Sequence, residues 1–379
     1  MTISSAGFEV PRYGGRSLAD LTPSVLASLG VAGERATLDL PPARRACVLL
    51  IDGLGWEQLS AHRALAPFLT SLADAAAPIT VGFPTTTATS LTSVGTGLAP
   101  GCHGVFGYEV AIPGGDHTLN QLRWSPDVDP EEWQPHATVY QRAERAGVAT
   151  AYIASGAFEG GGLSRASARG SRYVPAEGTD EVGAAVAARL AAHDRALLFA
   201  YHPGLDSSGH QWGIDSDDWR AELARVDRLA ERIAGALPPG SALYVTGDHG
   251  MVDVGAGARI DVGTDPDFAA GVRVLAGEAR ARHVYTHPGA APDVLAAWSE
   301  RLGAAAVVLS RDAAIDAGLF GPVDDRLRAR IGDIVAVARG DTALMNPGSD
   351  SAEATMVGMH GSLTTAELYV PLLRAATGA

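Results

Sequence analysis

The stretch Cys47-Val48-Leu49-Leu50-Ile51-Asp52-Gly53 decides the fold of this chain. A short apolar run that ends on a carboxylate and a glycine is typical of a strand buried on both faces, as strands are in parallel sheets. Similar runs occur at 149–154, 196–201 and 242–246, and helical patterns at 138–146, 179–193 and 216–237 lie between them. This alternation predicts an α/β protein with a mostly parallel central sheet and helices on both faces.

The window from 256 to 350 has a different character. Short apolar runs at 273–275, 305–309 and 333–337, with a helical pattern at 291–302, predict a smaller α+β insertion. We therefore expect residues 1–255 to form the first part of the α/β core, residues 256–350 an insertion or cap, and residues 351–379 a return segment of the core.

Six side chains of metal-ligating types gather mostly at the ends of the apolar runs. Parallel sheets place their sites just beyond the carboxyl ends of the strands, so four distant segments can deliver three carboxylates and three imidazoles to one place. That inventory is typical of a two-metal hydrolytic centre. The six residues are Asp52, Asp206, His210, Asp248, His249 and His360.

Each of these residues also has a plainer interpretation. Taken alone, Asp248-His249 is typical of a solvated turn, and Asp52 is typical of a helix cap. Asp206 and His210 are separated by Ser207-Ser208-Gly209, a composition common in loops. We favour the metal centre because most of the set sits where a parallel sheet places functional groups.

Composition limits the function further. The 379 residues carry a net charge of −14, which argues against binding a nucleic-acid polymer, because that task needs a basic footprint. All 29 basic residues are arginine, which excludes a lysine Schiff base and a P-loop lysine. No apolar run is long enough to span a bilayer, and the first residues do not resemble a secretory signal, so we expect a cytoplasmic protein.

A nucleophile is expected in Phe83-Pro84-Thr85-Thr86-Thr87-Ala88, which precedes a predicted helix that ends at Gly97. A cation bound to a threonine oxygen lowers the pKa of the hydroxyl, and a helix N-terminus favours the negative charge that results. The alternative is that these threonines only cap the helix.

The ordered set of motifs resembles the alkaline phosphatase superfamily, and most of all its type I phosphodiesterase/nucleotide pyrophosphatase branch. The matching pieces follow the family's order and cover most of the chain from about 46 to 373. They are Leu50-Ile51-Asp52-Gly53, Phe83-Pro84-Thr85-Thr86-Thr87, Thr96-Gly97-Leu98-Ala99-Pro100-Gly101-Cys102-His103-Gly104, Asp206-Ser207-Ser208-Gly209-His210, Thr246-Gly247-Asp248-His249-Gly250, and His360-Gly361-Ser362 before Val370-Pro371-Leu372.

The resemblance implies a role for each site residue. It implies two divalent metal ions, with Zn²⁺ favoured and Mn²⁺ or Fe as alternatives, and an alkaline-phosphatase-like fold. The implied reaction is in-line attack on phosphorus through a covalent phospho-threonine. Thr87 matches the nucleophile, which also reaches toward the second metal. The ligands of one metal match Asp206, His210 and His360, and those of the second match Asp52, Asp248 and His249.

Three positions depart from the family's pattern. The residue after the nucleophile is usually aromatic and is Ala88 here, and an asparagine that usually supports the phosphate is replaced by Tyr108 or nearby Gly107. The family's usual Pro-Asn is Thr89-Ser90. The resemblance therefore implies the metal chemistry and leaves the preference for nucleotides open.

We expect a phosphodiesterase or nucleotide pyrophosphatase-like hydrolase that acts on a small-molecule phosphoester. Two divalent ions, three aspartates and an alkoxide give a neutral site that favours a singly charged diester, and no arginine is identified from sequence to serve a dianion. The alternative within this chemistry is a phosphomonoesterase or phosphonate hydrolase. From another class, the alternative is a metal-stabilised binding module without turnover.

Overall fold

The central sheet of the computed structural model, which describes residues 7–348 and 353–378, has six strands in the order β18-β8-β1-β7-β5-β6. Neighbouring strands run parallel, except that β18 pairs antiparallel with β8. This arrangement confirms the predicted α/β fold with a mostly parallel sheet. The strands are β1 (Arg45–Ile51), β5 (Ala149–Ala154), β6 (Arg172–Pro175), β7 (Ala196–His202), β8 (Ser241–Thr246) and β18 (Leu372–Ala376).

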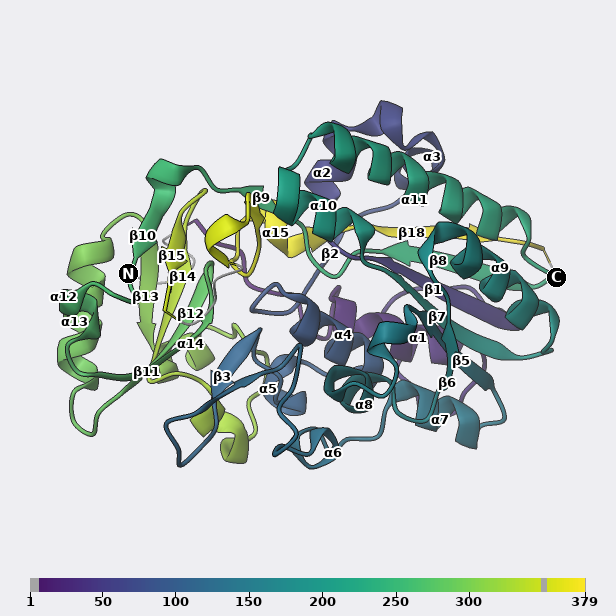
Figure 1. The fold of residues 1–379 in the computed structure, drawn as a ribbon. Coiled ribbons are helices and arrows are strands. Elements are labelled where there is room, and N and C mark those ends of the chain that lie inside the picture. The colour runs from purple at the N-terminus through teal and green to yellow at the C-terminus, as the bar shows by residue number, and fades with distance from the viewer. Residues whose placement is uncertain (1–6, 349–352, 379) are drawn as a thin grey trace.

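Alternate residues of β1 point into two separate cores, which is why the strand is apolar throughout. Val48 and Leu50 pack in one core, whereas Leu49 and Ile51 pack in the other. Each such fully buried side chain contributes roughly 1.5–3 kcal/mol. Figure 1 shows the two helical layers on opposite faces of the sheet. One layer contains α1 (Leu21–Ser28), α4 (Thr87–Thr96), α7 (Val139–Arg145) and α8 (Gly162–Ala168), and the other contains α2 (Trp56–Ala61), α3 (Pro67–Ala73), α9 (Gly178–Ala191) and α11 (Asp217–Gly235).

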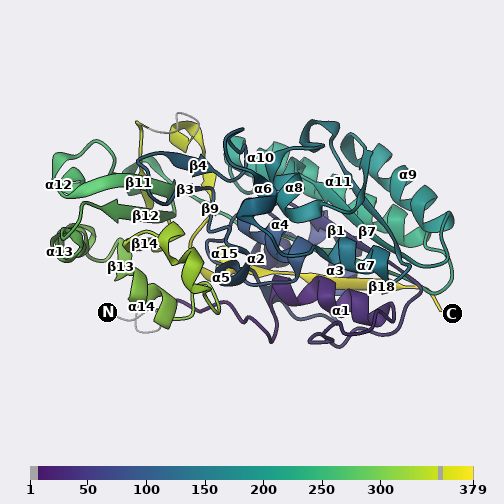
Figure 2. The same cartoon turned by 90° about the horizontal axis from the view of Figure 1, so that it is seen from below.

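A second sheet lies at one end of the elongated molecule (Figures 1 and 2). Its four antiparallel strands follow the order β11-β12-β14-β13, and α13 (Ala291–Leu302) packs on it through Trp298. The sequence predicted α+β structure in this window but not β12, in which the charged Arg282 and the polar His283 interrupt the apolar pattern. The domain boundaries after 255 and 350 stay predictions. The strands are β11 (Val272–Glu278), β12 (Ala281–Thr286), β13 (Ala306–Ser310) and β14 (Ile334–Ala338).

Short elements connect the two sheets and cover the site. The Pro, Gly, Asp and Trp residues of the stretch 111–135 predict a surface excursion, and part of this stretch forms the β3–β4 hairpin. The short strands are β2 (Ile79–Thr80), β3 (Glu109–Ala111), β4 (Thr118–Asn120), β9 (Val252–Asp253), β10 (Arg259–Asp261), β15 (Ala343–Met345), β16 (Gly358–Met359) and β17 (Tyr369–Val370). The short helices are α5 (Pro100–His103), α6 (Pro130–Trp133), α12 (Pro266–Ala269), α14 (Arg311–Asp316) and α15 (Thr365–Leu368).

Two local predictions were wrong in detail. The stretch from Trp56 to Ala75 follows the first strand and predicts a single helix, but this helix is broken, because Pro67 cannot continue a helix and instead begins α3. The segment containing Asp206 and His210, interpreted as a turn, is the helix α10 (Gly204–Trp212).

Among the described residues, no helix is both long enough and apolar enough to cross a membrane.

Candidate metal centre and active site

The site forms where three adjacent strands end. β1 lies between β7 and β8, and the register pairs Ile51 with His202 and Leu50 with Thr246. The residues that follow these strands therefore emerge at one edge of the sheet. The backbone N–H of Asp206 donates to the carbonyl of Asp52 at 3.0 Å, which fixes the start of α10 against the end of β1.

The first cluster, here called the His249 triad, consists of Asp52, Asp248 and His249. The Nε2 atom of His249 lies 3.3 Å from Asp52 Oδ1 and 3.4 Å from Asp248 Oδ2. All three side chains are buried. The second oxygen of Asp248 accepts hydrogen bonds from the backbone of Gly53 and His249, at 3.0 and 3.1 Å, so the carboxylate is held in one orientation.

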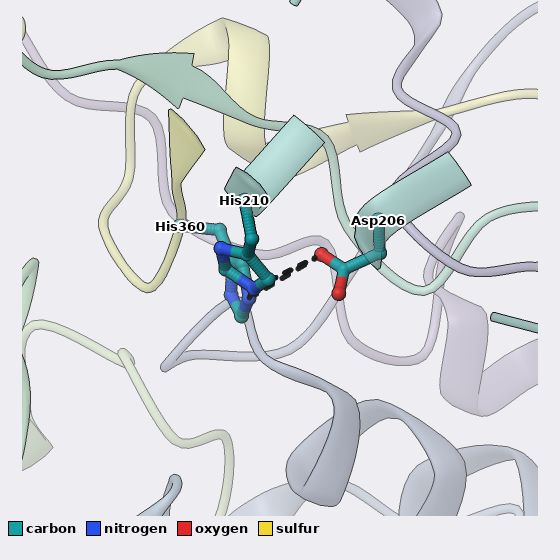
Figure 3. A group of neighbouring side chains, drawn as sticks. All are labelled: Asp206, His210 and His360. Carbon is teal, nitrogen blue, oxygen red and sulfur yellow. Dashed lines mark hydrogen bonds and ion pairs between the residues drawn. The ribbon is translucent and has the colours of Figure 1, made fainter. Parts of the chain in front are cut away.

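The second cluster, here called the His360 triad, consists of Asp206, His210 and His360. Asp206 and His210 lie four residues apart on one face of α10, and His360 follows β16 (Figure 3). Asp206 Oδ1 lies 3.3 Å from His210 Nε2 and 3.7 Å from His360 Nε2. The two triads adjoin, because the rings of His249 and His360 stack with centroids 3.6 Å apart.

A glycine makes this proximity possible. Gly53 has φ of +76°, and a Cβ atom there would lie 3.0 Å from the Cα of Asp206. Any other residue would have a strained backbone at this φ, and its Cβ atom would press against the start of α10.

The three imidazoles share one orientation. The Nδ1 atoms of His210, His249 and His360 lie 2.8, 3.1 and 2.9 Å from backbone carbonyls of Gly358, Gly250 and Thr85. A carbonyl only accepts, so each Nδ1 carries the proton and each Nε2 presents a lone pair to its triad. His360 Nε2 and His210 Nε2 face each other at 3.3 Å with no proton between them. A cation bound between the two Nε2 atoms would stabilise this arrangement.

The carboxylates point to the same conclusion. One buried oxygen of each aspartate, Asp52 Oδ1, Asp206 Oδ1 and Asp248 Oδ2, has no hydrogen-bond partner among the described residues. Burial raises the pKa of Asp52 well above its ordinary value, with Asp248 and Asp206 adding to the effect, and burial likewise raises the pKa of Asp248. Burial, together with His249 and His210, lowers the pKa of His360. Orphaned oxygens facing lone-pair nitrogens fit one divalent cation in each triad.

Three consecutive threonines lie beside the triads, and their hydroxyls have different partners. The Thr85 hydroxyl donates to Ser362 at 2.9 Å and accepts from Gly361 at 3.0 Å, while Thr86 hydrogen-bonds the carboxyl of Glu278. Thr87 Oγ1 instead faces the His249 triad, 3.5 Å from Asp52 Oδ2 and 3.4 Å from His249 Nε2. Of the three, Thr87 is therefore the one placed to react.

Helix α4 carries Thr87 at its first position, with Thr86 as the N-cap residue. The first N–H groups of a helix have no intrahelical acceptor and favour negative charge nearby. Ser90, one of the departures from the family's pattern, donates to the backbone carbonyl of Asp248 at 2.6 Å and so fastens α4 to the end of β8.

Two cavities meet at Thr87. The acidic lobe, with a volume of about 210 Å³, lies beside the His360 triad and contains Tyr108, Glu278, Glu353 and Met359. The aromatic lobe, with a volume of about 500 Å³, lies beside Asp52 and contains Tyr152, Phe158, Leu163 and Tyr201. Thr87, Asp206, Leu122 and Arg123 line both lobes.

Three residues of this site were not predicted from the sequence. Tyr201 donates its hydroxyl to Asp52 Oδ2, and a polar tip at the end of an apolar strand was the available signal. No local sequence pattern around Glu278 or Arg123 indicates that these residues line a functional site. His202 ends β7 close in sequence to Asp206, but its Nε2 atom pairs with Glu222 of α11 at 2.6 Å.

The family that the sequence matches places this chain in the class of phosphoester hydrolases. The chain belongs to the type I phosphodiesterase/nucleotide pyrophosphatase family, whose model matches residues 46–363. This match confirms the resemblance found in the motifs.

Solved structures share the fold. Murine ectonucleotide pyrophosphatase/phosphodiesterase 5, as an inactive variant in complex with AMP, is 20% identical, with a TM-score of 0.71 over 88% of each chain. Phosphonoacetate hydrolase from Sinorhizobium meliloti 1021, in complex with phosphonoacetate, is 19% identical, with a TM-score of 0.66 over 92% of each chain. None of the curated proteins matches the chain.

Proposed function

We propose that this chain is a two-metal phosphodiesterase, related in chemistry to nucleotide pyrophosphatases, that works through a covalent phosphoryl group on Thr87. The observation that carries the proposal is the placement of one hydroxyl. Thr87 Oγ1 lies at a helix N-terminus, within 3.5 Å of Asp52 Oδ2 and His249 Nε2, where both lobes meet.

The His249 triad would hold one divalent ion and the His360 triad the other, with Zn²⁺ the favoured metal and Mn²⁺ or Fe the alternatives. Nitrogen and carboxylate donors in sets of three suit Zn²⁺ with an open position for substrate. When bound, such ions stabilise negative charge on phosphoryl oxygens and lower the pKa of hydroxyls beside them.

The chain's own residues account for the remaining steps. Thr87 Oγ1 attacks phosphorus and gives up its proton while the bond from phosphorus to the leaving oxygen breaks. The leaving oxygen takes up one proton in turn and departs as an alcohol. Water then cleaves the phosphorus–Thr87 bond, which releases a phosphomonoester and restores the hydroxyl. Tyr201 keeps Asp52 oriented throughout, because burial and the nearby carboxylates raise the pKa of its phenol and it stays a donor.

The two lobes favour a diester. A phosphodiester carries two organic substituents, and the lobes on either side of Thr87 offer a separate space for each. Ala88, which lines the acidic lobe, provides no ring for a nucleobase. In the aromatic lobe, Tyr201 and Phe158 pack edge to face with ring centroids 5.9 Å apart. A flat or apolar substituent therefore suits the aromatic lobe.

One observation favours a second candidate, a phosphomonoesterase or phosphonate hydrolase. Arg123 lines both lobes, and its guanidinium has no ion pair among the described residues. A cation there would offset the second charge of a dianionic substrate. The structural similarity to a phosphonoacetate hydrolase is compatible with this alternative.

A direct test compares bis(p-nitrophenyl) phosphate, p-nitrophenyl phosphate and phosphonoacetate as substrates of metal-stripped protein reloaded with Zn²⁺ or Mn²⁺. We expect the diester to have the highest kcat/KM and activity to require metal. A higher kcat/KM for the monoester or the phosphonate would favour the second candidate. Bound metal without turnover of any ester would favour a binding module and refute both.

A further inference from the structure

A carboxyl group outside both triads is built into the wall of the acidic lobe. Glu278 ends β11, is only 7% exposed and lines the cavity beside Thr86. Its Oε1 atom has no hydrogen-bond partner among the described residues. A buried acceptor left unsatisfied costs roughly 1–3 kcal/mol, so a ligand that supplies a donor is favoured there.

Neighbouring groups hydrogen-bond one oxygen of this carboxyl and leave the other without a partner. The Thr86 hydroxyl and the backbone N–H of Tyr108 hydrogen-bond the group, while burial raises its pKa to about 8. Because Oε1 remains unpartnered, these donors engage the other oxygen. Gly107, with φ of +124°, packs close to the free atom, since a Cβ there would lie 3.2 Å from Oε1.

The nearby arginines form ion pairs with other glutamates. Arg282 pairs with Glu353 at 2.5 Å, and Arg280 pairs with Glu367 at 2.7 Å. Neither arginine lines the lobe, and among the described lining residues Arg123 is the one arginine, at the wall shared with the aromatic lobe. The lobe therefore offers acceptors to a ligand and few donors.

We propose that Glu278 determines specificity by accepting a hydrogen bond from a hydroxyl or ammonium group on the substituent that occupies the acidic lobe. This inference rests on the proposed function, in which that lobe holds one arm of a phosphodiester. A cavity of about 210 Å³ suits a substituent of a few heavy atoms. A neutral carboxyl still accepts a hydrogen bond from a hydroxyl group, whereas a charged hydrogen bond to an ammonium group needs the ionised carboxylate. The ratios are therefore compared at about pH 9, above the pKa of about 8.

The test uses three p-nitrophenyl phosphodiesters whose second substituent is propyl, 2-hydroxyethyl or 2-aminoethyl. These groups have the same number of heavy atoms and differ in their donor. For the metal-loaded protein we expect kcat/KM of the hydroxyethyl diester to exceed that of the propyl diester by about 10-fold, the value for one neutral hydrogen bond. We expect kcat/KM of the aminoethyl diester to exceed that of the propyl diester by up to about 100-fold, the value for one charged hydrogen bond.

Variants assign the preference to the residue. Glu278→Ala should bring both ratios to about one. Glu278→Gln should keep part of the hydroxyethyl preference through its amide oxygen and lose the additional preference for aminoethyl. Glu353→Gln is the matched control, because that carboxyl lines the same lobe but already accepts from Arg282, and its ratios should follow those of the unmodified protein.

Equal kcat/KM for all three diesters in the unmodified protein would overturn the role of Glu278 and leave the diesterase intact. No hydrolysis of any diester would overturn the proposed function itself. If Glu278→Ala does not fold, the aminoethyl ratio of Glu278→Gln decides, and an unchanged ratio refutes the inference.

Discussion

Removing the hydroxyl of Thr87 should separate catalysis from folding and from metal binding. Thr87→Ala deletes a hydroxyl that faces the His249 triad, and we expect kcat to fall at least ~10³-fold, which corresponds to about 4 kcal/mol of activation free energy. The cost to stability should be only about 1 kcal/mol, since the contacts of Thr87 Oγ1 are long, at 3.4 and 3.5 Å. Asp52 also keeps its hydrogen bond from Tyr201.

The assay pairs turnover of bis(p-nitrophenyl) phosphate with metal content by elemental analysis and thermal unfolding. Thr87→Ser is the matched control, because it keeps an oxygen at the same position, and it should retain activity within about 10-fold. A rapid quench of the unmodified protein should trap a p-nitrophenylphosphoryl group on Thr87, and the alanine variant should trap none.

Two results would refute this reasoning. Full activity of Thr87→Ala would show that another group attacks phosphorus. Loss of metal from the same variant, with its fold intact, would show that the hydroxyl acts mainly as a ligand.

Three further predictions concern metal binding, packing and pH. Asp248→Asn keeps an oxygen that accepts from the backbone of Gly53 but places an NH₂ group where Oδ2 faces His249. We therefore expect metal content and activity to fall together. An unchanged zinc content would contradict the assignment of Asp248 as a metal ligand. Arg280→Ala leaves the fully buried Glu367 unpaired and should lower the free energy of unfolding by about 3–5 kcal/mol in denaturant titrations, whereas a loss below about 1 kcal/mol would show that the pair is dispensable. Burial raises the pKa of Glu278 from 4.5 to about 8, so the stability that its protonated form contributes is complete below 4.5 and lost as pH rises through about 8. Glu278→Gln should therefore gain stability relative to the metal-free unmodified protein between about pH 5 and about pH 9, and parallel melting curves would contradict the shift.

Much of the fold could be predicted from local sequence. The run from Cys47 to Ile51 buries both faces of one strand, and this requirement is visible as an unbroken apolar stretch. The amphipathic helix α11 was visible for a similar reason, since its buried residues recur every three or four positions. β12 was missed because Arg282 and His283 are buried there through partners distant in sequence.

The candidate site likewise contains features that could be predicted from local sequence and features that could not. The six candidate ligands, three aspartates and three histidines, could be named from the sequence because each follows a strand or a recognisable motif. The helical conformation of α10 could not, since Ser207-Ser208-Gly209 is a poor helical sequence, and its neighbours Asp52 and Gly358 lie far away in the chain.

By itself the sequence determined the strands that converge on the site and the inventory of carboxylates, imidazoles and threonines, because apolar periodicity and residue chemistry are local properties. Only the tertiary structure decided which threonine faces a triad, and that Tyr201 fixes Asp52. It also decided that Glu278 and Arg123 reach the two lobes from other segments. The physical reason is that these choices depend on distances between atoms far apart in the chain, which packing sets and no local pattern encodes.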